Sequence, residues 1–280
     1  MDTGQPLRAD VAEWMQRQGD RGTPVAISII VPAFNEERRL PPTLIDIIDF
    51  FDARGEPYEI IVVDDGSTDE TAAVVRKFER LRPQLRLLRI PKNHGKGHSV
   101  RTGALNARGA LVLFVDADGA TPIAEFDRLA TAVAEGAEVA FGSRALAGDG
   151  TRVSTRLHRR LMGRVFNAVV NLLVLPDVAD TQCGFKLFTA RAAAFLFGHQ
   201  QCNGFGFDVE LLLIARRAGI SAREIPVNWT NVAGSKVRLI TDSIRMLRDL
   251  FVFRVRHREI TPARYASESA ARSIDTAAIP

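Results

Sequence analysis

The chain has 280 residues, 46% of them hydrophobic and 25% charged, with a formal net charge of +4 at pH 7. This composition is average for a globular protein and ample for a sizeable core. The basic balance favours anionic partners such as nucleotides, phosphates or an acidic lipid surface. Two cysteines, Cys183 and Cys202, exclude a disulfide framework and a recognisable zinc pattern, so we expect reduced thiols.

The N-terminal residues 1–24 are polar and contain no apolar signal core. No window of the sequence approaches 18 uninterrupted apolar residues, so we predict no transmembrane helix. We expect residues 1–24 to be an extension that precedes the folded domain. The protein is expected to be cytoplasmic, either soluble or attached to a membrane surface.

From residue 25 onward, predicted strands alternate with predicted helices. Apolar, β-branched runs indicate the strands, and apolar residues at helical spacing indicate the helices between them. The predicted strands are 25–32, 58–67, 85–90, 111–116 and 137–143, and the predicted helices are 41–55, 68–81, 97–109 and 122–135. Repeated βαβ units are typical of a three-layer α/β fold with a mostly parallel central sheet.

The pattern changes after residue 144. Residues 152–176 are basic first and apolar later, which predicts a pair of amphipathic helices. After them we predict a loop at 180–186, a helix from Phe207, a short strand at 223–229 and a basic amphipathic helix at 237–258. The tail, residues 259–280, is rich in Ala, Ser and Thr and is expected to be disordered.

Polar residues directly follow several of the predicted strands. In an open parallel sheet the carboxyl ends of the strands meet at one edge, and ligands bind there. The sequence therefore predicts one rim that carries Asn35, Asp64, Asp65, Asn93, Lys96, Asp116 and Asp118.

Asp116 and Asp118 end a buried run and are separated only by Ala117. Side chains alternate along an extended backbone, so the two carboxylates should lie on the same side. Together they could hold Mg²⁺ or Mn²⁺ through oxygen ligands and leave positions for diphosphate oxygens. The alternative is a pair of aspartates that cap the turn before Gly119. The other polar residues of the rim favour the metal site.

Two further loops of the rim have chemistry that suits a nucleotide. Residues 64–67, Asp-Asp-Gly-Ser, form either an Asx turn before a helix or a contact to a ribose or base. Residues 93–97 are glycine-rich around Lys96 and could approach a phosphate. They do not match a Walker motif, because its spacing is absent.

Five runs of the sequence resemble family 2 of the inverting glycosyltransferases, which use nucleotide-sugar donors on a GT-A fold. They are IIVPAFNEE, VVDDGSTD, NHGKG, FVDADG and FGSR. Three later runs resemble the dolichyl-phosphate β-glucosyltransferases: DTQCGFKLF at 180–188, FGFDVELLLIA at 205–215 and IPVNWTNVAGSK at 225–236. Together these motifs lie between residues 27 and 250, which is most of the chain.

The resemblance implies a role for each matching residue on the donor side. It implies that Glu36 and Asp65 contact the uridine half of the donor, and that Asp116 and Asp118 reach the diphosphate through Mg²⁺ or Mn²⁺. The whole expected donor-binding set is Pro32, Ala33, Asn35, Glu36, Asp65, Lys96, Asp116 and Ala117. The nucleotide-sugar half of the domain would comprise residues 25–144.

The acceptor half would comprise residues 145–258 of the same domain, 25–258. The resemblance implies that Arg144 meets the acceptor phosphate, and we expect Arg156 and Lys186 to bind the acceptor too. Asp118, Asp180 and Arg144 are the expected catalytic residues. Asp180 would be a base if the acceptor were a hydroxyl, or otherwise an orienter of Lys186 or of an arginine.

The expected reaction is transfer of glucose from UDP-glucose to a polyprenyl or dolichyl phosphate with inversion. Residues 157–176 and 236–258 would attach the protein peripherally to the membrane surface, and we expect no nucleic-acid partner. Two alternatives stay open: a relative that uses GDP-mannose or a soluble hydroxyl acceptor, and a haloacid-dehalogenase-like phosphatase suggested by FVDADGAT. The intact Asp116, Asp118 and Arg144 argue against a third, a non-catalytic binding protein of the same fold.

Overall fold

A seven-stranded sheet forms the centre of the molecule in the computed structural model, which describes residues 24–148, 150–154, 167–232 and 239–277. The strand order is β3-β2-β1-β4-β7-β5-β8. The strands are β1 (Ile27–Ala33), β2 (Tyr58–Asp65), β3 (Leu85–Ile90), β4 (Leu111–Val115), β5 (Val139–Ser143), β7 (Phe185–Thr189) and β8 (Ala222–Pro226). A second, two-stranded sheet pairs β6 (Val153–Ser154) with β9 (Trp229–Thr230).

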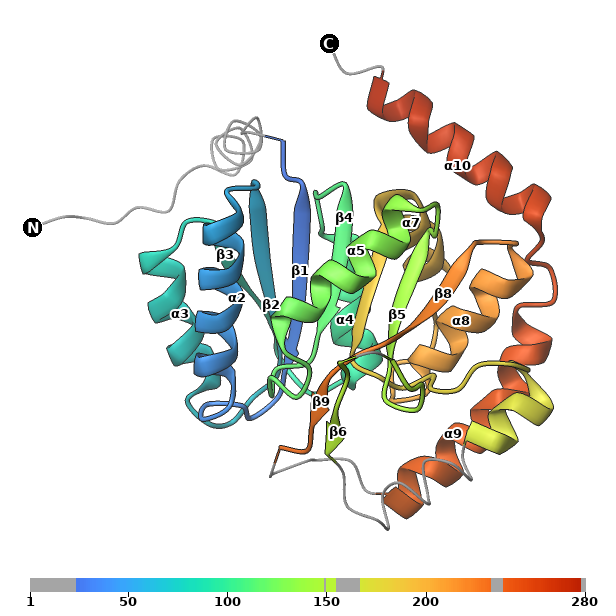
Figure 1. The fold of residues 1–280 in the computed structure, drawn as a ribbon, viewed down its shortest axis with the longest axis horizontal. Helices are drawn as coiled ribbons and strands as arrows, with labels where there is room; N and C mark the ends of the chain where they lie inside the picture. Colours follow the sequence, from blue (N-terminus) through green and yellow to red (C-terminus); the bar gives the residue numbers. More distant parts are fainter. Residues whose placement is uncertain (1–23, 149, 155–166, 233–238, 278–280) are drawn as a thin grey trace, which may run out of the picture.

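Helices cover both faces of the central sheet, as Figure 1 shows. They are α2 (Leu40–Arg54), α3 (Thr71–Leu81), α4 (Lys96–Leu105), the 3-10 turn η1 (Ile123–Glu125), α5 (Phe126–Ala134), α7 (Ala190–His199), α8 (Phe207–Arg217), α9 (Leu239–Arg256) and α10 (Pro262–Ala277). Residues 167–173 are also helical. The predicted three-layer α/β architecture is confirmed.

The sheet is parallel except at one strand. β1, β2, β3 and β4 pair in parallel, and so do β5 and β8, whereas β7 runs antiparallel between β4 and β5. The prediction of a loop over 180–186 is wrong at its end, because Phe185 and Lys186 begin β7. This short strand has a buried lysine as its second residue, and its place in the sheet depends on the two strands that flank it.

Alternate residues of the central strands pack into two separate cores. Ile29 and Val31 of β1 face the layer of α2, α3 and α5, where Phe51 and Phe126 meet edge to face at 5.2 Å. Ile30 faces the layer of α4, α7 and α8. Strands buried on both faces are apolar throughout, which is why 25–32 and 58–67 could be recognised as strands.

The order of the strands reverses between β1 and β4. Chain connections lead from β1 toward β2 and β3 on one side, and from β4 toward β7, β5 and β8 on the other. Such a switch point leaves a crevice at the carboxyl ends of the strands, where ligands of α/β proteins bind. The small β6–β9 sheet lies below this edge in Figure 1.

The C-terminal tail forms a helix over most of its length, so the prediction of disorder for 259–280 is wrong for the described residues. Tyr265 of α10 is buried against Phe195 of α7, with ring centroids 4.9 Å apart, and Arg191 lies over its ring. The composition was misleading because a single buried stripe is enough to dock a helix. Residues 278–280, and residues 1–23 of the predicted extension, lie outside the described part.

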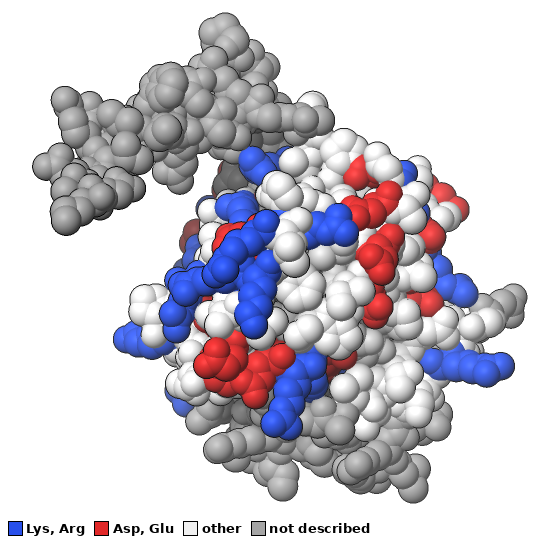
Figure 2. Space-filling model, turned by 90° about the vertical axis from the view of Figure 1, so that its left-hand side faces the viewer, with Lys and Arg blue, Asp and Glu red and all other residues white. Residues whose placement is uncertain are grey.

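Figure 2 views the molecule toward its β3 edge, where lysine and arginine side chains gather among a few carboxylates. Arg86 and Arg89 belong to this edge strand, and each lies 3.4 Å from a buried carboxylate of β2, Glu59 and Asp64 respectively. Charged side chains on an edge strand discourage pairing with another chain. We interpret this basic face as protection of the sheet edge.

Candidate active site

Asp116 and Asp118 follow β4 at the switch point, and two cations of the same chain compensate their charge. Lys96 Nζ lies 2.6 Å from Asp116 Oδ1, and Arg39 Nη1 lies 3.6 Å from Asp118 Oδ2. Arg39 also pairs with both carboxylate oxygens of Glu36. Burial and the nearby charge of Asp116 raise the pKa of Asp118.

The two carboxylates suit a divalent cation bound together with a diphosphate. Their side chains are 32% and 25% exposed, so a ligand can reach them. In the described part of the chain no group of three or more His, Cys, Asp or Glu side chains could hold a metal. A cation here would therefore take its remaining ligands from phosphate or water, which is the usual habit of Mg²⁺.

Lys96 stands in the first turn of α4, on a loop that Asp65 holds. The two carboxylate oxygens of Asp65 accept hydrogen bonds from the backbone N–H groups of His94 and Gly95, at 2.9 and 2.8 Å. Gly95 has φ +107°, which only glycine adopts readily. Burial lowers the pKa of Lys96, but Asp116 and Asp208 outweigh it, so the net shift is upward and the lysine stays charged.

Asn35 and Glu36 connect the end of β1 to the loop that follows β2. Asn35 has φ +54°; its N–H donates to Ser67 Oγ, and its Oδ1 accepts from the N–H of Thr68. The N–H of Glu36 donates to Thr71 Oγ1 at 2.7 Å. The strand order thus brings the predicted donor-side residues to one edge, namely Pro32, Ala33, Asn35, Glu36, Asp65, Lys96, Asp116 and Ala117.

Arg144 and Asp180 form a second charged unit beyond β5. Nε and Nη2 of Arg144 donate to the two Asp180 oxygens at 2.6 and 2.8 Å, and its backbone N–H donates at 3.0 Å. Burial raises the pKa of Asp180, but Arg144 and the backbone donors outweigh it and lower the net value. Asp180 is therefore ionised at neutral pH with its oxygens occupied. Glu224 holds its backbone by accepting the N–H groups of Ala179 and Asp180.

Lys186 lies beneath the rim, with its side chain 1% exposed. Its Nζ donates to Cys183 O and to Asp208 Oδ1, both at 2.6 Å. This position does not support the prediction that Lys186 binds the acceptor, because the side chain is buried and its ammonium group is hydrogen-bonded to Cys183 and Asp208. It supports the 180–184 turn instead. The other predicted acceptor residue, Arg156, lies outside the described residues.

Gly184, in the 180–184 turn, lies directly against Asp116. Its carbonyl accepts the N–H of Asp116 at 3.0 Å, and a Cβ at this position would lie 2.0 Å from Asp116 Oδ2. Only a glycine lets the turn approach Asp116 this closely. The sequence alone did not single out Arg39, Gly184, Glu224 and Trp229 as site residues. Gly184 and Trp229 lie inside the motifs DTQCGFKLF and IPVNWTNVAGSK, and Arg39 follows IIVPAFNEE by two residues.

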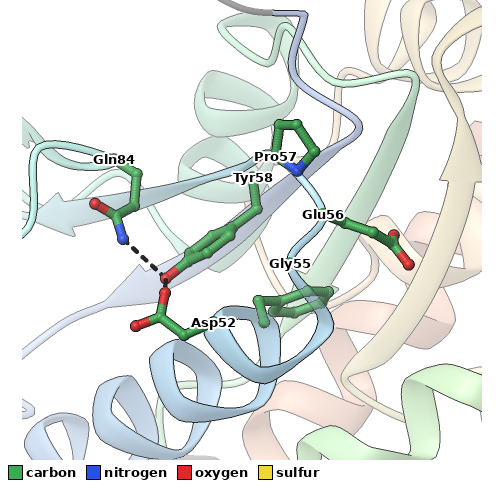
Figure 3. Close-up of a pocket in the computed structure, with 7 residues that line it drawn as sticks. Asp52, Gly55, Glu56, Pro57, Tyr58 and Gln84 are labelled. Atoms are coloured by element: carbon green, nitrogen blue, oxygen red, sulfur yellow. Dashed lines mark hydrogen bonds between the residues drawn. The ribbon is translucent and has the colours of Figure 1, made fainter.

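A surface pocket between α2 and β2 lies away from these residues, at the amino end of β2 (Figure 3). Phe51, Asp52, Gly55, Glu56, Pro57, Tyr58 and Gln84 line it. The Tyr58 hydroxyl donates to Asp52 and accepts from Gln84. Burial, together with the Asp52 carboxylate, raises the pKa of Tyr58 to about 12. This pocket has none of the residues of the rim.

Comparison with known proteins finds relatives that match most of the chain. The chain is 39% identical over 237 residues to dolichyl-phosphate beta-glucosyltransferase ALG5C of Trichomonas vaginalis, covering 81% of this chain and 70% of that protein. It is 38% identical over 245 residues to the dolichyl-phosphate beta-glucosyltransferase of Dictyostelium discoideum, covering 83% and 75%.

A solved structure shares the fold. Glucosyl-3-phosphoglycerate synthase from Mycobacterium tuberculosis, in complex with Mn²⁺ and UDP-glucose, superposes with a TM-score of 0.56 at 19% identity, over 90% of this chain and 84% of that one. The model of Glycosyl transferase family 2 matches residues 28–197. This chain is a glycosyltransferase and belongs to Glycosyl transferase family 2.

Proposed function

We propose that the protein transfers glucose from UDP-glucose to a polyprenyl or dolichyl phosphate with inversion. Relatives named dolichyl-phosphate beta-glucosyltransferases, 38–39% identical over most of the chain, support the sugar and the acceptor class. The observation that carries the proposal is the charged Arg144–Asp180 unit, close enough to Asp116 for their charges to interact. In this unit Arg144 could bind an acceptor anion. Asp180 could not readily act as a base, because its oxygens already accept hydrogen bonds from Arg144.

On the donor side, Asp116 and Asp118 would hold Mg²⁺ or Mn²⁺. A bound cation supplies Lewis-acid neutralisation of the charge that grows on the departing uridine diphosphate. Lys96, which now pairs with Asp116, adds positive charge at the same place. Asp65 keeps the Lys96 loop in position through its two backbone hydrogen bonds.

On the acceptor side, a phosphate monoester is already ionised at neutral pH and needs no strong base. One of its oxygens would attack the anomeric carbon of glucose and form the new C–O bond. The bond to the diphosphate breaks with its electron pair leaving on UDP, so attack from the opposite face inverts the configuration. Arg144 would bring the two anions together by compensating the acceptor charge.

The alternative of a hydroxyl acceptor requires a general base. The best-placed carboxylate is Asp180, but its lowered pKa and its bonds to Arg144 and Gln182 make it a weak proton acceptor. We therefore propose that Asp180 orients Arg144. The phosphatase alternative would place its aspartate motif after the first strand, whereas Asp116 follows β4.

We further propose that α9 rests on an anionic membrane surface at the cytoplasmic face. Its outward residues combine apolar and basic side chains: Phe251 is 60% exposed and Val255 67%, and Arg248, Arg254 and Arg256 are exposed beside them. That combination is typical of a helix that lies in the membrane interface. Among the described helices, none has the length and apolar character to cross a bilayer.

The test of the donor and metal is a calorimetric titration with UDP-glucose and with GDP-mannose, each with and without Mn²⁺. We expect Mn²⁺-dependent binding of UDP-glucose, and loss of that binding in Asp118→Ala. Radiolabelled glucose should then appear in the lipid fraction when dolichyl phosphate is added. Binding of GDP-mannose in place of UDP-glucose would overturn the proposed donor, and label on a hydroxyl acceptor would overturn the proposed acceptor.

A further inference from the structure

The two residues of β9 connect the acceptor side of the site to the donor side. The N–H of Trp229 donates to Arg152 O at 3.0 Å, in the segment that leads into β6. The N–H of Thr230 donates at 2.8 Å to the carbonyl of Ala120, two residues after Asp118. Adjacent backbone groups of one short strand thus hold the β6 segment and the turn of the carboxylate pair.

The Trp229 side chain contacts Arg144, the cation that we propose binds the acceptor phosphate. The guanidinium carbon of Arg144 lies 5.5 Å from the centroid of the Trp229 ring, within the range of a cation–π contact. Asp180 accepts from Nε and from one N–H of Nη2, so among the described contacts the two N–H groups of Nη1 and the second N–H of Nη2 are left for another anion. The indole and the carboxylate therefore define both the plane and the direction of the guanidinium.

We propose that Trp229 is a positioning residue that orders Arg144 for a phosphate monoester before the acceptor arrives. An arginine held only by its two hydrogen bonds to one carboxylate can still rotate about that contact. It would lose this rotational freedom on binding the acceptor. Packing against the indole removes the freedom in advance, so binding energy is not used to order the side chain. Through the hydrogen bond from Thr230 to Ala120, the same strand also fixes the position of Arg144 relative to the Asp116–Asp118 turn.

This inference rests on the proposed function for the identity of the anion, a polyprenyl phosphate, but its test separates the two. The chain has two tryptophans, Trp14 and Trp229. Trp14→Phe leaves Trp229 as the sole tryptophan and serves as the control background. In it, farnesyl phosphate should change the Trp229 emission saturably, and Arg144→Gln should abolish that change. UDP-glucose with Mn²⁺ should not reproduce it.

Kinetics of two variants complete the test. Trp229→Leu should raise the KM for farnesyl phosphate about tenfold or more, while the Kd for UDP-glucose with Mn²⁺ stays within about twofold of wild type. Trp229→Phe keeps a ring against the guanidinium and should recover most of the loss. An unchanged acceptor KM in Trp229→Leu, or an equal loss of donor affinity, would overturn the positioning role.

The outcomes also distinguish this role from the proposed reaction. If wild type transfers no glucose to farnesyl or dolichyl phosphate, yet the Trp229 emission responds in an Arg144-dependent way, the proposed acceptor is wrong and the positioning role stands for another phosphate monoester. If transfer occurs and the emission does not respond, the positioning role is wrong. Absence of both overturns both.

Discussion

At the scale of single residues, the site depends on how each carboxylate is partnered. Asp116 and Asp118 face a lysine and an arginine, whereas Asp180 is held by Arg144 and by backbone donors. The first pair is partly exposed, and under the proposed function it would exchange its partners for a metal and a diphosphate. Asp180 is buried, and its hydrogen bonds hold its side chain in one orientation. The same residue type thus serves two purposes because its surroundings differ.

We predict that Gly184→Ala weakens Mn²⁺-dependent binding of UDP-glucose by about tenfold or more. The added Cβ would fall 2.0 Å from Asp116 Oδ2, so either the turn or the carboxylate must move, and displaced metal ligands lose affinity. The control is Gly204→Ala, where an added Cβ meets nothing within 4 Å and φ is not positive. Calorimetry on both variants checks this, and equal affinities would contradict it.

We predict that Asp180→Asn lowers glucose transfer about 10- to 100-fold and leaves donor binding unchanged. The amide keeps the shape but loses the charge that orients Arg144, as with other residues that position a functional group. Steady-state kinetics with lipid phosphate and calorimetry with UDP-glucose measure the two effects. A parallel loss of donor affinity would show that Asp180 supports the whole site.

The lowered pKa of Asp180 also predicts a dependence of stability on pH. Its contribution to the free energy of unfolding is fully present above the unfolded value, about 3.9, and is lost as the pH falls through the lower folded value. The stability difference between wild type and Asp180→Asn should therefore shrink below about pH 4. Urea unfolding of both proteins at neutral and acidic pH measures this difference, and a constant difference would contradict it.

At the scale of elements, α10 extends the core from a segment of unremarkable composition. Tyr265 fills the interface with α7, and its hydroxyl bonds to Glu138 just before β5. One aromatic side chain therefore ties the C-terminal helix to both a helix and the end of a strand. Burial and the Glu138 carboxylate raise the pKa of this hydroxyl, so it stays protonated and can donate.

We predict that Tyr265→Ala lowers the free energy of unfolding by about 3 kcal/mol, because it removes a buried aromatic ring. Tyr265→Phe keeps the ring and loses only the hydrogen bond, so it should cost about 1 kcal/mol. Chemical denaturation of the full chain measures both values. If the two variants were equally stable, the hydroxyl rather than the ring would hold α10.

At the scale of the whole molecule, charge and exposed apolar surface are distributed unevenly. The β3 edge carries arginines paired with buried carboxylates, whereas α9 exposes Phe251 and Val255 among arginines. The first face has its charges compensated. The α9 face has exposed apolar side chains and arginines, and both favour binding to an anionic lipid surface.

We predict that Phe251→Asp reduces sedimentation with vesicles that contain phosphatidylserine, because it places a negative charge in the apolar stripe that would enter the interface. The matched control is Leu81→Asp on α3, where an equally apolar residue is 77% exposed away from α9. Binding should also weaken as salt screens the arginines. Equal sedimentation of both variants would reject α9 as the contact surface.

The structure of residues 25–144 was predictable because its signals are local. Strands buried on both faces are continuous apolar runs, and Pro41 and Gly55 mark the ends of α2. The polar residues that follow each strand meet at one edge whenever the sheet is parallel. Those facts were enough to predict that Asp65, Lys96 and Asp116 lie at one edge of the sheet, and the structure places them there.

Tertiary structure decided the rest, because those features depend on residues far apart in the chain. β7 exists as a strand because β4 and β5 flank it, and Lys186 is buried because Asp208, 22 residues later, neutralises it. Sequence alone determined the fold class, the family and the carboxylate pair. The tertiary structure decides which opposite charges pair. That pairing separates the charged groups that stay exposed for ligands from those that only hold other groups in place, because the energy of a charge depends on its surroundings in space.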